Sequence, residues 1–311
     1  MLEKLEGRFL VTFLTVVGEG SFSRAADKLG YVQSTVTSQI QMLEQICGNK
    51  LFHRLSRGVK PTDAGEKLAV YARQFVQLGQ MLEEDLGSLE RPRGPVRVRA
   101  LESFCVTRLS GFLNPFFAEY PEVTLLLDTG FQGDIVDQVA SHEIDFGIVP
   151  KDPEREDILF EPLVEENLVL VCSNELASRI RSEDWSGLTG VQVIGFGSRC
   201  VYHNDGLRIL AELGLPASAP QAEFPSTEMI RSMVACGLGI AFVPEITMEK
   251  ELATGTVVSI PLPKPVRMNH GLIWHRDRVL GTPAKVFREK LLEYITSPPN
   301  KTLELSDRDP V

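Results

Sequence analysis

The stretch Ser21–Phe52, SFSRAADKLGYVQSTVTSQIQMLEQICGNKLF, decides the fold of the N-terminal part of this chain. It predicts two short helices, over Ser23–Leu29 and Gln33–Ile46, joined by a tight turn. Ser23 is the expected N-cap of the first helix, and Gly30 suits the left-handed position that closes it. The segment is therefore interpreted as a helix-turn-helix.

The second helix of this pair is expected to have two different faces. Val36, Ile40 and Leu43 recur at helical spacing and are predicted to face inward. The opposite face carries small hydrogen-bonding side chains, namely Ser34, Ser38 and Gln41, with Thr35 and Thr37 on its flanks. Such a face suits the major groove of DNA, where donors and acceptors read base edges. From periodicity alone, a solvated helical hairpin is the alternative.

A basic hairpin is predicted directly after the helix pair, over Leu51–Pro61 with its turn near Gly58. Its cations Arg54, Arg57 and Lys60 are expected to reach phosphates or an adjacent minor groove. Basic loops are also common as solvated surface, so the phosphate-binding interpretation depends on the neighbouring helix pair.

This region resembles the winged helix-turn-helix of the LysR-type transcriptional regulators. The matching residues are Phe22, Ala25, Ala26, Leu29, Gln33, Val36, Gln39, Ile40, Leu43, Glu44, Leu51, Phe52, Arg54, Thr62 and Gly65. The resemblance implies binding to double-stranded promoter DNA, with Gln33 reading a base and Arg24 among the contacts. Relatives commonly have Gln-Pro-Ala-Val-Ser-Arg-Gln-Ile where this chain has QSTVTSQI, so Ser38 replaces the usual cation.

Charge is distributed unevenly along the chain, whose formal net charge is −10. Residues 1–60 contain eight Lys or Arg and five Asp or Glu, a net charge of +3. The remainder contains 24 basic and 37 acidic residues, a net charge of −13. This asymmetry favours a DNA-binding head on a body that phosphates repel. Because the head is only mildly basic, two or more heads are expected to share the binding.

Composition indicates a bacterial-type cytoplasmic protein without a membrane partner. The 311 residues, 43% hydrophobic and 24% charged, suit about two ordinary domains. No apolar run approaches the roughly 18–20 residues of a membrane helix, and the start, MLEKLEGRFLVTF, lacks the features of a signal peptide. Five scattered cysteines favour a reducing compartment.

A long helix is predicted over residues 62–90, with Thr62 as its cap and Asp63 in its first turn. Apolar residues recur along it at spacings of three and four: Leu68, Tyr71, Phe75, Leu78, Leu82, Leu86 and Leu89. This seam favours pairing with a second copy of the chain. The alternative, packing on its own head, is less favoured because a helix about 40 Å long exceeds a 60-residue domain. A Pro/Gly hinge follows at 91–95.

Strands and helices are predicted to alternate from Val96 onward. The expected strands are Val96–Leu101, Val123–Asp128, Asp145–Val149, Leu168–Cys172, Val191–Phe196, Gln221–Phe224, Gly239–Pro244, Thr256–Pro261 and Gly271–His275. The expected helices lie near Val106–Glu119, Gly133–His142, Asn204–Leu213, Thr227–Ala235 and Pro283–Ile295. This order predicts an α/β fold with a mainly parallel sheet and helices on both faces.

The alternating part resembles the effector domain of the same family, which is similar to periplasmic solute-binding proteins. The implied organisation is a winged helix-turn-helix (1–61), a dimerisation helix (62–90), the hinge, and a two-lobed effector domain (96–297). Lobe I comprises 96–162 and 266–297, lobe II comprises 163–265, and two crossing strands join them. A flexible tail (298–311) follows. The resemblance also implies a homodimer or homotetramer, and RNA polymerase as a partner if the protein is an activator.

Three strand-to-helix turns, beginning near Ser103, Ser198 and Thr227, are expected to converge on the cleft between the lobes, with Thr129 at a fourth edge. Hydroxyls and free amides at helix starts hold small anions. The family places its effector between the first two turns, so the candidate contacts are Ser103, Phe104, Cys105, Thr129, Ser198, Arg199, Cys200 and Thr227. The alternative for each serine is simple helix capping.

Cys105 and Cys200 fall in the two facing turns, near helix N-termini that lower a thiol pKa. That arrangement permits a redox disulfide, as in the peroxide-sensing members of the family, although those members place both cysteines in the second lobe. Apolar lining of the cleft is the alternative. The remaining cysteines are predicted core residues: Cys47, Cys172 and Cys236.

The sequence predicts no enzyme, no metal site and no cofactor. The histidines His142, His203, His270 and His275 lack metal-ligand spacing. No Gly-x-Ser-x-Gly elbow is present, and the sequence GFGS at 195–198 lacks the rest of a dinucleotide fingerprint. The competing class is a solute-binding or enzyme-like α/β protein with an incidental N-terminal hairpin. The helix-turn-helix motif and the seam of the long helix count against that class.

Overall fold

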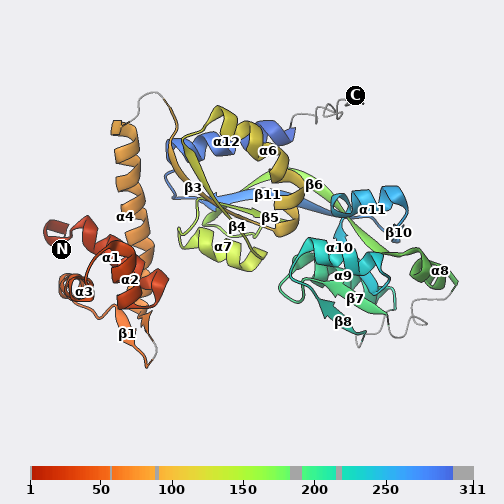
Figure 1. The fold of residues 1–311 in the computed structure, drawn as a ribbon, viewed down its shortest axis with the longest axis horizontal. Coiled ribbons are helices and arrows are strands. Elements are labelled where there is room, and N and C mark those ends of the chain that lie inside the picture. The colour runs from red at the N-terminus through yellow and green to blue at the C-terminus, as the bar shows by residue number, and fades with distance from the viewer. Residues whose placement is uncertain (1, 57, 88–90, 183–190, 215–218, 297–311) are drawn as a thin grey trace, which may run out of the picture.

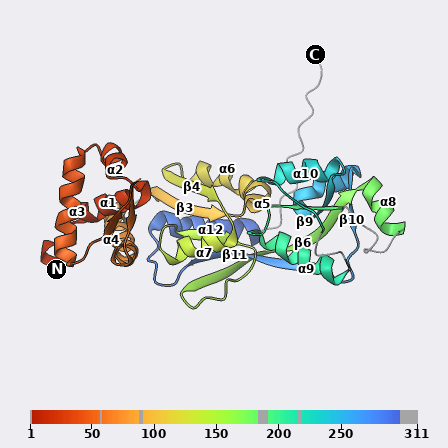
Figure 2. The same ribbon diagram turned by 90° about the horizontal axis from the view of Figure 1, so that it is seen from below.

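The structure is a computed structural model that describes residues 2–56, 58–87, 91–182, 191–214 and 219–296. A small N-terminal head, one long helix and a two-lobed α/β body follow one another along the molecule (Figure 1). The same order appears after a quarter turn, with the head at one end and lobe II at the other (Figure 2). The predicted tail, 298–311, lies outside the described residues.

The head is built from helices around one apolar core, with a hairpin at its edge. After a short 3-10 turn (Leu2–Lys4) come α1 (Gly7–Glu19), α2 (Phe22–Leu29), α3 (Gln33–Cys47), β1 (Phe52–Arg54) and β2 (Val59–Pro61). The sequence interpretation did not identify α1, which buries Phe9, Leu10, Phe13 and Val16 in this core. The helix pair and the hairpin are confirmed, since β1 and β2 pair antiparallel.

The cap of α2 is Ser21, and the prediction of Ser23 was wrong. The extended Ser21 side chain accepts a hydrogen bond from the amide of Arg24 at 3.4 Å. The helix therefore begins at Phe22, which places Ser23 inside its first turn. Gly30 ends α2 at φ 68°, the left-handed conformation expected of it.

Helix α4 (Asp63–Gly87) connects the head to the body, and Thr62 caps it as predicted. The Gly65 amide donates to the Thr62 hydroxyl at 3.1 Å. Residues 88–90 lie outside the described residues, and Gly94 and Pro95 belong to the first strand of the body, so the predicted hinge was too long. The strand begins early because the Gly94 amide donates to the Glu122 carbonyl.

A single mixed sheet runs through both lobes. Its strands are β3 (Gly94–Ala100), β4 (Val123–Thr129), β5 (Phe146–Val149), β6 (Ile158–Ser173), β7 (Gln192–Gly195), β8 (Gln221–Glu223), β9 (Gly239–Pro244), β10 (Val257–Ile260) and β11 (Val266–His275). Their order is β4-β3-β5-β11-β6-β9-β7-β8, and β10 pairs with β6.

The prediction of a mainly parallel sheet was wrong for its centre. Strand β3 pairs parallel with β4 and β5, and β7 pairs parallel with β8 and β9. All pairs made by β6 and β11 are antiparallel. These two long strands pair from Val266↔Leu168 to His275↔Ile158, which confirms two crossing strands between the lobes (Figure 1).

Helices cover both faces of the sheet in each lobe. In lobe I, α5 (Glu102–Phe104), a π-helical segment (Cys105–Leu109), α6 (Ser110–Glu119) and α12 (Thr282–Thr296) lie opposite α7 (Gln132–Ala140). Lobe II carries α8 (Asn174–Ser182), α9 (Val201–Glu212), α10 (Thr227–Ala235), a 3-10 turn (Glu245–Met248) and α11 (Glu249–Thr254). Separate apolar clusters fill the layers, such as Phe112, Phe116 and Phe287 between α6, α12 and the sheet.

The described helices include none with the length and apolarity that crossing a membrane requires. Of the cysteines predicted to be core, Cys172 is buried, Cys47 is half-buried and Cys236 is exposed. The prediction for Cys236 was therefore wrong. It caps the C-terminus of α10 and its thiol donates to the Met233 carbonyl, which turns it toward the surface.

Candidate DNA interface and inter-lobe cleft

Helix α3 has the two faces that its sequence predicts. Val36, Ile40 and Leu43 are almost fully buried. The exposed side chains are those expected to read or contact DNA: Gln33, Ser34, Ser38 and Gln41, with Thr35 and Thr37 half-buried on the flanks. The Thr37 hydroxyl donates to the Gln33 carbonyl at 2.9 Å, so its hydrogen is used within its own helix.

Two polar contacts fix α3 within the head. The buried Thr12 hydroxyl of α1 donates to Gln39 Oε1 at 2.6 Å. At the other end, the Leu51 amide donates to Glu44 Oε1 at 3.0 Å, which ties α3 to the start of the hairpin. The exposed face of α3 and the basic hairpin are therefore held in one arrangement, as a surface that reads DNA requires.

The cations of the head differ in how they are neutralised. Arg54 and Lys60 are exposed on the hairpin, and neither has a carboxylate partner among the described residues. Arg57 lies outside the described residues. Arg24 and Lys28 share Glu19 at 3.8 Å and 2.7 Å, and the Lys28 hydrogen bond and charge lower the pKa of that carboxyl group. Arg54 and Lys60 thus offer free charge, whereas Arg24 must exchange an internal partner for a phosphate.

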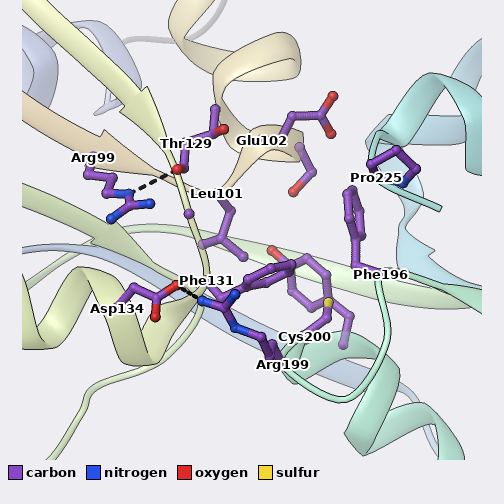
Figure 3. A pocket seen from close by; sticks show the side chains of 13 residues that line it. Arg99, Leu101, Glu102, Thr129, Phe131, Asp134, Phe196, Arg199, Cys200 and Pro225 are labelled. Carbon is purple, nitrogen blue, oxygen red and sulfur yellow. Dashed lines mark hydrogen bonds and ion pairs between the residues drawn. The ribbon is translucent and has the colours of Figure 1, made fainter. Parts of the chain in front are cut away.

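A cavity of about 190 Å³ lies between the lobes (Figure 3). Its lining comes from the ends of β3 and β4, from the starts of α5, α7 and α9, and from the loop before α10. The lining residues are Arg99, Leu101, Glu102, Ser103, Thr129, Gly130, Phe131, Asp134, Phe196, Arg199, Cys200, Tyr202 and Pro225. Four predicted effector contacts are therefore brought together here: Ser103, Thr129, Arg199 and Cys200.

A carboxylate bridges the two lobes beside this cavity. Glu102, at the start of α5, accepts a hydrogen bond from the Thr227 amide at 2.8 Å and another from the Thr227 hydroxyl. Thr227 opens α10 in lobe II, where an anion is favoured by the helix dipole. A side chain of lobe I thus occupies the helix start at which the sequence predicted an effector contact. Sequence reasoning missed Glu102, although it directly precedes Ser103.

A second bridge pairs charges across the mouth of the cleft. Arg199 donates to Asp134, and its guanidinium lies 4.9 Å from the centroid of the Phe131 ring (Figure 3). The Arg199 side chain is 61% exposed, so solvent screens the pair and its contribution to stability is small. The cation predicted as counter-charge for the effector therefore already has an internal partner.

A third bridge lies under the floor of the cavity. The Tyr202 hydroxyl of lobe II is hydrogen-bonded to His270 Nε2 on the crossing strand β11. Burial raises the pKa of Tyr202 and lowers the pKa of His270 to about 4, so both are neutral near pH 7. Ser103 is only 5% exposed and lines the cavity together with Tyr202.

The other predicted contacts lie away from the cavity wall. Phe104 is buried and stacks on His270, with ring centroids 5.7 Å apart. Ser198 is exposed and its carbonyl accepts from Asn204, which stabilises the loop before α9. Cys105 packs against the lobe I core.

The expectation of lowered thiol pKa values was wrong. Burial, together with the charges of Glu102 and Asp128, raises the pKa of Cys105 to about 12. Burial also raises the pKa of Cys200. Both thiols are free in the structure. At neutral pH neither thiol is a reactive thiolate, which removes the basis for the redox interpretation.

A helix-turn-helix head joined to a two-lobed domain with a cleft defines a class of DNA-binding proteins regulated by ligands. Residues 8–66 match the bacterial regulatory helix-turn-helix protein, lysR family, and residues 89–296 match the LysR substrate binding domain. The chain belongs to the LysR family of transcriptional regulators.

Individual relatives are similar over 79–95% of this chain. The HTH-type transcriptional regulator YofA of Bacillus velezensis is 31% identical over 297 residues, covering 95% of this chain and 99% of that protein. YofA of Bacillus subtilis is 32% identical over 245 residues, covering 79% of this chain and 83% of that protein. Among solved structures, ArgP from Mycobacterium tuberculosis has a similar fold, with a TM-score of 0.77 at 19% identity over 94% of this chain and 98% of that one. Both YofA proteins are HTH-type transcriptional regulators.

Proposed function

We propose that this regulator binds a specific promoter sequence through α3 and the hairpin, and that a small anionic effector in the inter-lobe cleft controls the response. The observation that carries the DNA-binding part is the exposed polar face of α3. It is anchored by Thr12 and Glu44. The hairpin that follows α3 carries Arg54 and Lys60, which are exposed and have no carboxylate partner in the described part of the chain. Phosphate contacts by such cations position a protein, and polar side chains in the groove select the sequence.

The anionic character of the effector is argued from the charges at the cleft. Arg99 and Arg199 line it, and the hydroxyls of Ser103 and Thr129 lie beside them. A carboxylate entering the cavity competes with Asp134 for Arg199 and with Glu102 for Thr227. Because those internal carboxylates bridge the lobes, replacing them favours a different lobe arrangement, as a ligand-driven switch requires.

Assembly as a homodimer through α4 is part of the proposal. Four apolar side chains of the predicted seam are exposed in the single chain: Tyr71 at 69%, Phe75 at 46%, Leu78 at 59% and Leu82 at 58%. The side chain of Leu86 and all of Leu89 lie outside the described residues. A row of this kind is typical of a helix that packs against a second copy. We further propose pairing of dimers into a tetramer, a cytoplasmic location, and contact with RNA polymerase if the protein activates.

Base reading by Gln33 is tested with DNA from upstream of the gene itself. Gln33→Ala should lose about 1–3 kcal/mol of discrimination at one base pair while binding random DNA normally. Gln45 provides a matched control because it is an exposed glutamine on the same helix, about 18 Å farther along the axis. Equal losses on specific and random DNA, or an equal effect of Gln45→Ala, would contradict the assignment.

The cleft is tested in a reporter assay with cell extract or candidate metabolites. Ser103→Ala should abolish the transcriptional response and leave DNA binding without effector unchanged, since the head is separated from the cleft by α4. Ser198→Ala is the control because that serine is exposed and lies off the cavity wall. A Ser103→Ala variant that responds fully would move the effector out of this cleft.

A further inference from the structure

A second cavity, of about 400 Å³, lies where α1, α4 and lobe I meet, away from the inter-lobe cleft. Its apolar side comes from the head and from Val76 of α4, and its polar side comes from other residues of α4 and from lobe I. The lining residues are Leu14, Val17, Gly18, Arg73, Val76, Gln77, Gln80, Arg97, His142, Glu143 and Arg278. This cavity therefore adjoins all three parts of the molecule.

Side chains of α4 hold the walls of this junction in place. Arg73 donates to the Ser141 carbonyl at 3.0 Å and pairs with Glu143 at 2.8 Å. Gln74 is hydrogen-bonded to His142 Nε2 at 2.7 Å. Gln77 donates to the Val279 carbonyl at 3.1 Å. The junction is thus a polar interface within one chain.

The charges around the cavity leave one cation unmatched. Arg278 is buried against Asp145 and also donates to the His142 carbonyl, and Arg73 is paired with Glu143. The backbone amide of Arg97, on β3, donates to the Asp145 carboxylate at 2.6 Å, and the Asp145 amide donates to the Arg97 carbonyl. Its guanidinium, however, has no carboxylate partner within the described ranges. The wall is therefore net positive at the position of Arg97.

His142 adds a polar atom and no charge. It is 3% exposed, and its Nδ1 has no hydrogen-bond partner in the described structure. Burial is the main cause that lowers the pKa of His142 to about 4, and the charges of the nearby His275, Arg278 and Arg73 lower it further. The ring is neutral near pH 7, and the neighbouring arginines that disfavour its protonation also favour an anion.

Pairing of two chains through the α4 seam leaves this cavity accessible. Helix positions advance by about 100° per residue. Arg73, Gln77 and Gln80 therefore project from the side of α4 opposite the seam around Phe75 and Leu78. A second copy that covers the seam does not fill the junction.

We propose that the junction binds a small oxyanion, a carboxylate or phosphate compound, with the Arg97 guanidinium as its principal partner. Arginine binds both groups through paired hydrogen bonds. The Gln80 amide, also on the wall, supplies a neutral donor. A ligand here contacts head, linker helix and lobe I at once, so it stabilises one orientation of the head independently of the inter-lobe effector.

The test is calorimetric titration of the full chain with inorganic phosphate and, separately, with citrate, at constant ionic strength set with chloride. Arg97→Gln should weaken binding by about tenfold or more, the loss of a charge-assisted contact. Arg267→Gln is the matched control because Arg267 is an exposed arginine on β11 that lines neither cavity, and it should leave the binding unchanged. Arg99→Gln reports on anion binding in the inter-lobe cleft, which Arg99 lines. Tighter binding of phosphate by the wild type would indicate a phosphate compound as the ligand, and tighter binding of citrate would indicate a carboxylate.

A second variant excludes an effect on folding. Gln80→Glu places a carboxylate in the wall beside Arg97 without altering β3, and it should also abolish anion binding. The proposal is overturned if neither anion binds saturably, if Arg97→Gln binds like the wild type, or if Arg99→Gln loses as much affinity. The last result would place the anion in the inter-lobe cleft.

Discussion

The hydrogen bonds between Glu102 and Thr227 should govern how readily the lobes separate. Both donors of Thr227 bond one carboxylate oxygen, and Thr227 itself is 6% exposed. Hydrogen bonds to a charged group contribute about 1.5–3 kcal/mol each. Because Glu102 is half-buried, the lower value applies, which gives about 3 kcal/mol for the pair. Glu102→Ala should therefore raise the local opening equilibrium by about a hundredfold. Glu102→Gln keeps an accepting oxygen, so it should raise the local opening equilibrium by only about tenfold.

Hydrogen–deuterium exchange at the Thr227 amide measures this opening directly. The control is Glu228→Gln, since Glu228 is a surface carboxylate on the next residue and pairs with Arg231. That variant should leave the exchange of the Thr227 amide as it is in the wild type. Unchanged exchange in both Glu102 variants would refute the view that this carboxylate holds the lobes together.

Three further outcomes are expected. Leu78→Asp combined with Leu82→Asp should bring like charges together along the α4 seam and halve the mass seen by light scattering; an unchanged mass would exclude pairing through this helix. Ser38→Arg should raise affinity for all DNA and steepen the salt dependence by up to about one charge, measured by anisotropy over a salt series. The folded pKa values of His142 and His270, about 4, lie below the usual 6.5, so the unfolded chain takes up protons first as pH falls. The urea midpoint should therefore drop between about pH 6.5 and pH 4, and an identical midpoint at pH 7 and pH 5 would be evidence against this.

The head could be predicted from sequence because its signals are local. The inward face of α3, the glycine that ends α2 and the threonine that begins α4 each depend on neighbours within a few residues. The Ser21 cap was misplaced by two positions because either serine could open the helix. Helix α1 was overlooked because its apolar residues signal burial without showing what they pack against.

The cleft could be predicted only in part because its contacts join distant segments. Strand-to-helix turns identified Ser103, Thr129 and Arg199 as lining residues. Glu102 and Thr227 are separated by 125 positions in the sequence. The spacing of apolar residues along the chain does not indicate which distant side chains bond to each other. The same limit explains the sheet, since an alternation of strands and helices does not distinguish the antiparallel β6 and β11 from parallel neighbours.

The central claim, a regulator that selects its DNA through α3, is tested most directly by competition binding on upstream DNA and on scrambled DNA of equal length. We expect the upstream DNA to be bound about a thousandfold or more tighter than the scrambled sequence, and Gln33→Ala to reduce this preference. Equal affinity for both DNAs, unaffected by that substitution, would contradict the claim.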